Sequence, residues 1–377
     1  MSFAPARRLE KAVTLALAFG FVLSLLLTGA LRLPYTRGRG TLYLRNRTLS
    51  GQRSAPEHVP LSASALLSAK FQEGIAKSYD ANFSGRELLI RLFNELSLRV
   101  FRTTAAGVLV GPGYSMIQRN YAEEFCLARD RPDKLAPLVT DLRRLQDFCD
   151  ARGIAFALVI TPSKAAIYPE GLPSDWRRRV RPGPRAYDQF VPLLQAKGVR
   201  FVDGHRLTAA LKPTVRVPLF PLGGVHWGEE AAVATANALL ELLASEKLDV
   251  QPIRDYGIRS SRYPTGQDAD MVDLCNLLLP MRYPVATVAI APVPTRMANR
   301  PNVVFVSGSF MFSLLQMLDA TRQFSEFQYY FYYRDAKGCY NDGEMHTLAE
   351  PAPLPDFDTA FFSAGALVLE ANEQTLC

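Results

Sequence analysis

A serine and a histidine, far apart in the chain, have the surroundings that acyl transfer needs. Ser309 follows the apolar run Val303-Val-Phe-Val306 and lies on a turn of small residues. A serine on a tight turn at a strand end exposes a hydroxyl that can act as a nucleophile. His226 lies in the loop Gly223-Gly-Val-His-Trp227, and an imidazole changes charge near neutral pH, which suits a general base. Together they suggest chemistry through a serine ester.

Each residue also has a structural interpretation. Ser309 could simply cap the helix expected after it, because serine is common at that position. A lone histidine is more often structural or solvent-exposed than catalytic. Ser307 and Ser313 are weaker candidates for the nucleophile, since one lies within the strand end and the other about one turn into the helix.

Strands alternate with helices through most of the chain. Apolar spacing predicts helices over 133–153, 184–198 and 229–246 and from near Ser309, and strands over 154–160, 199–202, 303–306 and 366–370, after a short strand and glycine-rich turn at 107–114. This alternation predicts an α/β fold with a mostly parallel sheet covered on both faces. Sites in such sheets form at the carboxyl ends of strands, where Ser309 would lie.

The N-terminal part predicts a membrane anchor. Arg7, Arg8 and Lys11 precede an uncharged stretch over 12–31. About 20 apolar residues span a bilayer as a helix, and the positive flank stays cytoplasmic. A cleaved signal peptide is the competing interpretation, although the apolar run exceeds the ~7 to 15 residues of a signal core. We expect a cytoplasmic tail over 1–11, an anchor over 12–31, a linker and helical arm over 32–104, and a catalytic domain over 105–377.

Composition and motifs bound the remaining classes of function. With 377 residues, 48% of them hydrophobic and 21% charged, the chain can bury a full core. The net charge of +7 is spread thinly, and the basic run 177–179 has no interleaved aromatics, so nucleic acid is not expected as a partner. Neither a P-loop nor a metal-ligand spacing is present, so no metal or other cofactor is expected.

The five cysteines leave an odd count and form no Cys-x-x-Cys pair, so structural zinc is not expected. Two interpretations are open. Cys126 and Cys149 could form a disulfide in an oxidising compartment, or the cysteines could be buried free thiols.

Several segments in combination resemble the exported SGNH-hydrolase-like O-acetyltransferases of the alginate acetylation type. They are residues 107–114, 161–173, 224–227, 273–276 and 307–310, with 369–373 also similar. The resemblance implies an SGNH-hydrolase-like three-layer sandwich with permuted motif order, in which Ser309 takes an acetyl group and His226 activates it. It also implies an exported polysaccharide as acceptor, a membrane-bound O-acyltransferase as acetyl supplier, and an inner-membrane protein with its catalytic domain in the periplasm.

Two departures from the family each remove a carboxylate. Gly224 stands where Asp-x-His-Trp has its aspartate, and Ser307-Gly308-Ser309 replaces Gly-Asp-Ser. Losing the acid of a serine protease triad costs up to ~10⁴ in turnover. A carboxylate from elsewhere could orient the histidine, a backbone carbonyl could do so in a dyad, or the protein could be an inactive relative that binds glycan or scaffolds an export complex. The candidate carboxylates are Asp203, Asp268, Asp270, Asp273 and Glu373.

Other residues of the matching segments have two interpretations each. Lys164 could contact an anionic sugar or the acyl donor, or could cap its loop while Tyr168 packs it. Asn276, in an expected helix, could donate to an oxyanion, although an amide on the helix surface is the commoner interpretation. The resemblance adds Asn372 as an oxyanion or substrate candidate. The aromatic run 327–333 could line a sugar groove, although a core strand is the commoner interpretation. An acetyl-esterase would use the same serine and histidine with water as acceptor.

Overall fold

The computed structural model describes residues 19–20, 49–51, 86–127, 132–293, 300–331, 335–340, 345–346, 361–374 and 376. The chain divides into two compact units. Residues 1–101 and 273–280 form the first, and residues 102–272 and 281–377 form the second. Most of the expected anchor lies outside the described residues. Within the described part, no helix is long and apolar enough to cross a membrane.

The first unit contains helix α4 (Arg86–Phe101), which lies within the expected helical arm. Asn94 on this helix donates from its amide to the carbonyl of Cys275 at 2.8 Å, and Glu95 accepts from the backbone N–H of Leu279 at 3.1 Å. The segment 273–280 therefore belongs structurally with α4 although it lies far along the chain.

The second unit is built around a seven-stranded sheet with the order β10-β9-β8-β7-β11-β3-β4. Its strands are β3 (Ala155–Thr161), β4 (Phe201–Asp203), β7 (Asn302–Ser307), β8 (Glu326–Phe331), β9 (Asp335–Tyr340), β10 (Met345–His346) and β11 (Ala366–Asn372). The five strands from β8 to β4 are parallel, whereas β9 and β10 continue the sheet antiparallel. The mostly parallel α/β sheet predicted from the sequence is thus confirmed.

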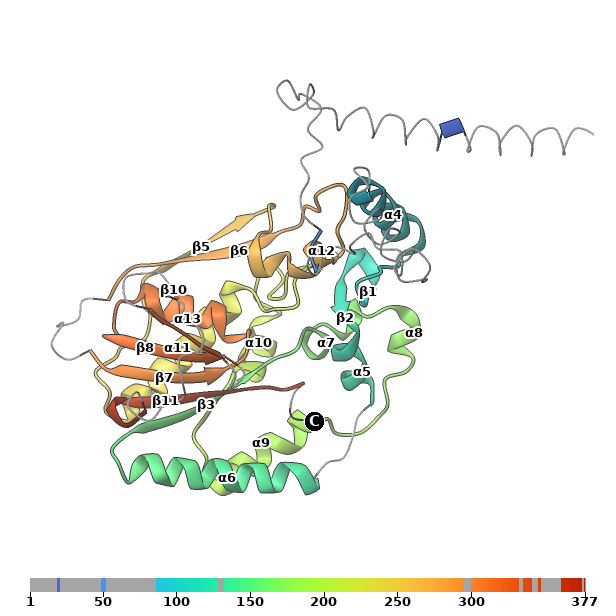
Figure 1. Cartoon of the computed structure of the whole chain (residues 1–377). Coiled ribbons are helices and arrows are strands. Elements are labelled where there is room, and N and C mark those ends of the chain that lie inside the picture. Colours follow the sequence, from blue (N-terminus) through green and yellow to red (C-terminus); the bar gives the residue numbers. More distant parts are fainter. Residues whose placement is uncertain are drawn as a thin grey trace, which may run out of the picture. The chain divides into compact units, whose positions relative to one another are not determined.

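Helices cover both faces of this sheet (Figure 1). Alternate residues of β3 point to opposite sides, as a strand requires. Ala157 and Val159 pack in one core with residues of α11 (Glu229–Ser245) and α13 (Met311–Ala320), whereas Phe156 and Leu158 pack in a second core with α6 (Pro132–Asp150) and α9 (Ala186–Lys197). The second unit is therefore a three-layer sandwich.

Shorter elements surround the edges of the sandwich. They are the antiparallel pairs β1 (Val108–Val110) with β2 (Met116–Gln118) and β5 (Tyr256–Ser261) with β6 (Val285–Ile290), the helices α5 (Arg119–Leu127), α7 (Lys164–Ile167), α8 (Ser174–Arg177), α10 (Gly204–Leu211) and α12 (Asp270–Leu274), and the 3₁₀ turns η2 (Pro112–Tyr114), η3 (Pro169–Gly171) and η4 (Gly266–Asp268). The strands β3, β4, β7 and β11 each run into a loop or helix at one edge of the sheet, which is the edge where parallel sheets carry their sites.

Two expectations about local structure were wrong. The helix after Ser309 begins at Met311, with Phe310 at the capping position, so Ser309 does not cap it. Asn276 lies beyond the end of α12 with a left-handed φ of 48° rather than inside a helix.

The suggested disulfide is also wrong. Cys126, Cys149 and Cys275 are buried free thiols. Burial raises the pKa of the Cys149 thiol to about 11, which keeps it protonated at neutral pH. The second interpretation of the cysteines, buried thiols, therefore holds for these three.

Candidate active site

Ser309 lies on the turn between β7 and α13, and this turn is held from three sides. The backbone N–H of Gly308 donates to Oε2 of Glu370 on the neighbouring strand β11 at 2.5 Å. The hydroxyl of Tyr329 on β8 donates to the carbonyl of Gly308 at 2.9 Å, and Gln267 donates from its amide to the carbonyl of Ser309 at 3.1 Å. These bonds leave the serine itself half-buried at the carboxyl edge of the sheet.

His226 lies in the loop before α11, and the loop is anchored in the core by its neighbour. Trp227 is only 1% exposed, and its indole N–H donates to the carbonyl of Phe310 at 2.9 Å. The His226 side chain is 11% exposed, and its imidazole lies against the Phe310 ring, with the centroids 4.8 Å apart. The two residues beside the reacting pair, Trp227 and Phe310, thus join the histidine loop to the serine turn.

The two segments bring the hydroxyl and the imidazole into contact. Nε2 of His226 lies 2.8 Å from Oγ of Ser309, and Nδ1 lies 2.6 Å from Oδ2 of Asp270. When Nδ1 carries the proton and donates to the carboxylate, Nε2 presents a lone pair to the serine hydroxyl. This is the tautomer that a general base needs.

Among the five candidate carboxylates, Asp270 is the one that contacts the histidine. Its other oxygen, Oδ1, accepts the backbone N–H of Val225 at 2.8 Å. The carboxylate is therefore hydrogen-bonded both to the imidazole and to the backbone of its loop. The segment that carries Asp270 packs directly on Gly224. A Cβ at Gly224 would lie 2.6 Å from the carbonyl oxygen of Gln267 and 3.1 Å from that of Asp268. The position without a carboxylate is therefore also a position without room for a side chain.

None of the other four candidate carboxylates is hydrogen-bonded to His226 in the described part of the chain. Asp203 accepts from the Tyr187 hydroxyl at 2.9 Å and caps α10, and Glu373 bonds Ser163 N–H and His205. Asp273 lies in the first unit. Asp268 lies two residues before Asp270, and burial together with the nearby Glu229 and Asp270 raises its pKa to about 6.

Lys164 supports the histidine loop from within. Its side chain is buried at 3% exposure, and its ammonium donates to the carbonyls of Pro221, Leu222 and Gly224 at 2.5, 2.8 and 3.1 Å. All three bonds go to the segment that leads into His226. Of the two interpretations of Lys164, this geometry supports the one in which it holds the loop, since the donors point into the loop.

The remaining predicted residues also have structural partners. The hydroxyl of Tyr168 accepts the N–H of Leu219 at 3.0 Å, and the ring packs against Phe220, which fits the loop-packing interpretation. Asn372 is 6% exposed and donates to Thr161 Oγ1 at 3.1 Å. Asn276 exchanges hydrogen bonds with the backbone of Ser50 within the first unit, at 2.8 and 3.2 Å.

Sequence reasoning missed two residues that hold the serine turn. Gln267 also accepts the hydroxyl of Ser313 at 2.7 Å, and nothing in the sequence marked it. Glu370 could have been noticed, because a carboxylate inside an apolar strand needs partners to offset its burial. It has them in Gly308 and in the hydroxyl of Thr161 at 2.5 Å, and burial raises its pKa. The aromatic run contributes Tyr329 and Tyr330 to the core, which supports its interpretation as a strand.

Comparisons with known proteins agree with the motif resemblance. A family model described as the SGNH hydrolase-like domain of the acetyltransferase AlgX matches residues 121–302, a span that contains His226 and Asp270. This match confirms the resemblance that the motifs indicated. A search of curated proteins finds no match.

Three solved structures are similar to the chain. The O-acetyltransferase domain of Pseudomonas putida AlgJ has 19% identity over 72% of this chain and 92% of that chain, with a TM-score of 0.46. Pseudomonas aeruginosa AlgX has 14% identity over 71% and 62%, with a TM-score of 0.43. Bacillus cereus PatB1 has 8% identity over 71% and 96%, with a TM-score of 0.45.

The buried ammonium of Lys164 predicts how stability depends on pH. Burial lowers its pKa to about 7, whereas an unfolded chain keeps a lysine pKa of about 10.4. Between these values the unfolded state binds more protons, so the free energy of unfolding rises with pH. We expect the difference in this free energy, wild type minus Lys164→Met, to increase by about 1 kcal/mol per pH unit above pH 7. Denaturant unfolding between pH 7 and 10 measures it.

Lys197→Met is the matched control, because Lys197 is exposed at the end of α9. The difference in the free energy of unfolding between the wild type and Lys197→Met should not change with pH. A difference for Lys164→Met that is equally flat would contradict the lowered pKa of this buried lysine.

Proposed function

We propose that this chain transfers acetyl groups to hydroxyls of an exported polysaccharide through an acetyl ester on Ser309. The observation that supports the chemistry is the run of hydrogen bonds from Asp270 through His226 to Ser309, at 2.6 and 2.8 Å. The similarity to an acetyltransferase domain supports acetyl as the group transferred, and the resemblance to polysaccharide O-acetyltransferases supports the class of acceptor.

In the first step, Oγ of Ser309 attacks the carbonyl carbon of an acetyl donor. The serine proton passes to Nε2 of His226, and the imidazolium is stabilised by the carboxylate of Asp270. When the bond to the leaving alcohol breaks, His226 returns the proton to the leaving oxygen. The products are acetyl-Ser309 and the free alcohol, with every proton accounted for.

In the second step, a sugar hydroxyl reverses these events. His226 takes the proton of the hydroxyl, the sugar oxygen forms a bond to the acetyl carbon, and the Ser309 oxygen leaves and recovers the proton. Water in place of the sugar would release acetate. The ring of Phe310 beside the imidazole and the two bonds of Asp270 hold the base in one orientation through both steps.

We also propose that the protein is anchored in the inner membrane with its catalytic domain in the periplasm, where a membrane-bound O-acyltransferase supplies acetyl groups. The uncharged stretch over 12–31 with its basic flank supports the anchor. The family resemblance supports the acetyl supplier.

Substitution of Ser309 and of Asp270 tests this function. With a chromogenic acetyl ester, Ser309→Ala should abolish the burst of released alcohol, because no acetyl-enzyme can form. Asp270→Asn should lower kcat by about 10⁴, as loss of the orienting acid does in serine proteases. Asp268→Asn, in the same segment but without a contact to His226, is the matched control and should stay near the wild-type rate. Near-wild-type turnover in Asp270→Asn, or a burst in Ser309→Ala, would refute the mechanism.

Gly224→Asp gives a sharper test of how the acid is supplied. It restores the aspartate that resembling proteins carry, but its Cβ would collide with the carbonyl of Gln267 and push away the segment that carries Asp270. A displacement of about 1 Å can cost 10²-fold, so we expect kcat/KM for the ester to fall about a hundredfold. Gly257→Asp, where a Cβ meets nothing within 4 Å, should have no effect. Increased activity in Gly224→Asp would show that Asp270 is not the orienting acid.

A further inference from the structure

A concave site lies on the same edge of the sheet as Ser309. It is a cavity of about 300 Å³, which is within the range of about 300 to 1,000 Å³ common for small-molecule sites. Ser309, His226 and Asp270 are not among the residues that line it. The mechanism above therefore leaves this pocket without a role.

The order of the strands places the pocket beside the reacting serine. Ser309 follows β7, Glu373 follows β11, Ser163 follows β3 and His205 follows β4, and these four strands are consecutive neighbours in the sheet. Glu373, Ser163 and His205 all line the pocket. Since adjacent strands are about 4.8 Å apart, the pocket begins roughly 5 to 10 Å along the sheet edge from Ser309.

A row of rings connects the two sites. The His226 ring lies 4.8 Å from that of Phe310, and the Phe310 ring is stacked at 6.1 Å on Tyr121, which lines the pocket. A molecule in the pocket would therefore contact the far side of the same row that flanks the base.

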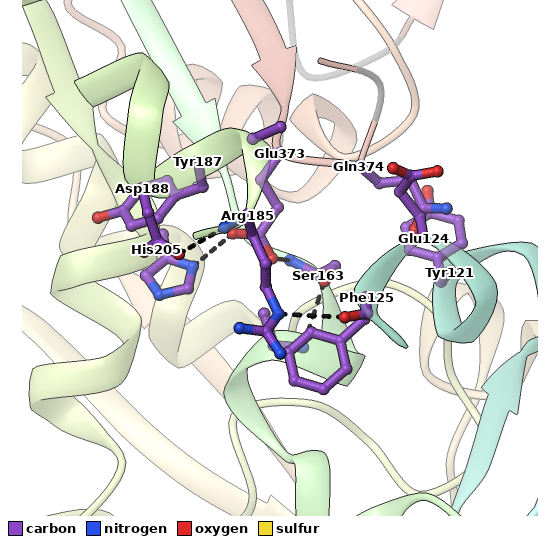
Figure 2. Close-up of a pocket in the computed structure, with 12 residues that line it drawn as sticks. Tyr121, Glu124, Phe125, Ser163, Arg185, Tyr187, Asp188, His205, Glu373 and Gln374 are labelled. Atoms are coloured by element: carbon purple, nitrogen blue, oxygen red, sulfur yellow. Dashed lines mark hydrogen bonds and ion pairs between the residues drawn. The ribbon is translucent and has the colours of Figure 1, made fainter. Parts of the chain in front are cut away.

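The lining of the pocket combines flat rings with carboxylates (Figure 2). Tyr121, Phe125 and Tyr187 bring aromatic rings to the lining, and Glu124 and Asp188 bring carboxylates. Sugar rings present the complementary groups, namely C–H faces that pack on aromatic rings and hydroxyls that donate to carboxylates.

The charges of the pocket favour an uncharged sugar. Arg185 is held by a 3.1 Å bond from its Nε to the Phe125 carbonyl, and its guanidinium lies over the Phe125 ring. The lining contains this one guanidinium and the two carboxylates of Glu124 and Asp188, so it gives an acidic sugar no net attraction.

His205 and Glu373 form one wall of the pocket. Nδ1 of His205 lies 2.5 Å from Glu373, whose other oxygen accepts the N–H of Ser163, and the imidazole is stacked on Tyr187 at 4.1 Å. Burial opposes a charged imidazole, but the bond to Glu373 and the negative charges of Glu373, Asp203 and Asp188 together raise the pKa of His205. When this ring is protonated, its charge offsets that of the Glu373 carboxylate.

We propose that this pocket is an acceptor subsite, which binds an uncharged sugar unit that flanks the sugar acetylated at Ser309. The inference rests on the proposed function and adds the class of acceptor to it. An acceptor must reach both sites at once, so a chain of sugars should be a much better acceptor than a single sugar.

The subsite is tested by how the acetyl group of the acetyl-enzyme partitions between a sugar acceptor and water. The protein is acetylated with a chromogenic ester in the presence of glucose, a cello-oligosaccharide or an oligouronate at equal concentrations of sugar units, and the ratio of acetylated sugar to free acetate is measured. We expect the ratio for the cello-oligosaccharide to exceed that for glucose about tenfold, as one good hydrogen bond to a charged group would give. The oligouronate should show no such advantage.

Two variants connect that advantage to the pocket. Glu124→Gln and Tyr121→Leu should each remove most of the advantage of the oligosaccharide. Glu123→Gln is the matched control, because Glu123 is the exposed neighbour of Glu124 on α5 and does not line the pocket, and it should keep the full advantage. An unchanged ratio in both pocket variants, or equal ratios for glucose and the oligosaccharide, would overturn the subsite. A preference for the oligouronate would overturn the uncharged class.

A failure of the proposed function gives a different result. In that case the ester shows no burst that depends on Ser309, whatever the sugar. Calorimetric binding of the cello-oligosaccharide to the Ser309→Ala protein then decides the subsite alone. Binding that Glu124→Gln weakens about tenfold supports the pocket as a glycan site, and no binding overturns it.

Discussion

A hydrogen bond of 2.6 Å between the imidazole of His226 and the carboxylate of Asp270 is the interaction on which the site depends. Without it the ring could carry its proton on either nitrogen, and the serine would face a donor as often as an acceptor. The surrounding structure holds the two partners together through backbone groups. Asp270 also accepts the N–H of Val225, and the absence of a side chain at Gly224 lets the 267–270 segment pack against the loop.

The loop that presents His226 is held by polar contacts buried in the sandwich. A single ammonium, on Lys164, accounts for three loop carbonyls, and Trp227 ties the loop to the turn after β7. Buried polar groups of this kind are costly unless every one is paired, so this network defines one arrangement of the loop. Glu370, on the adjacent strand, holds the turn of Ser309 in one arrangement in the same way, by accepting the N–H of Gly308.

The sequence predicted most of the sandwich because its strands are apolar runs and its helices have clear spacing. It also indicated Ser309 and His226, because the small residues that mark their turns are their immediate neighbours in the sequence. It could not select Asp270 among five carboxylates, because that choice depends on the close approach of a distant segment to Gly224. The buried position of Lys164 was equally hidden, since its three partners are backbone carbonyls that carry no signature in the sequence.

The most direct measurement is the location of the acetyl group during turnover. The full chain is mixed with an acetyl ester, quenched in acid within the burst, digested, and its peptides are analysed by mass spectrometry. We expect one acetylated peptide, modified at Ser309, that disappears when a sugar acceptor is added before the quench. Acetate release with no modified peptide, or an acetyl group on a different residue, would contradict transfer through the serine that His226 and Asp270 orient.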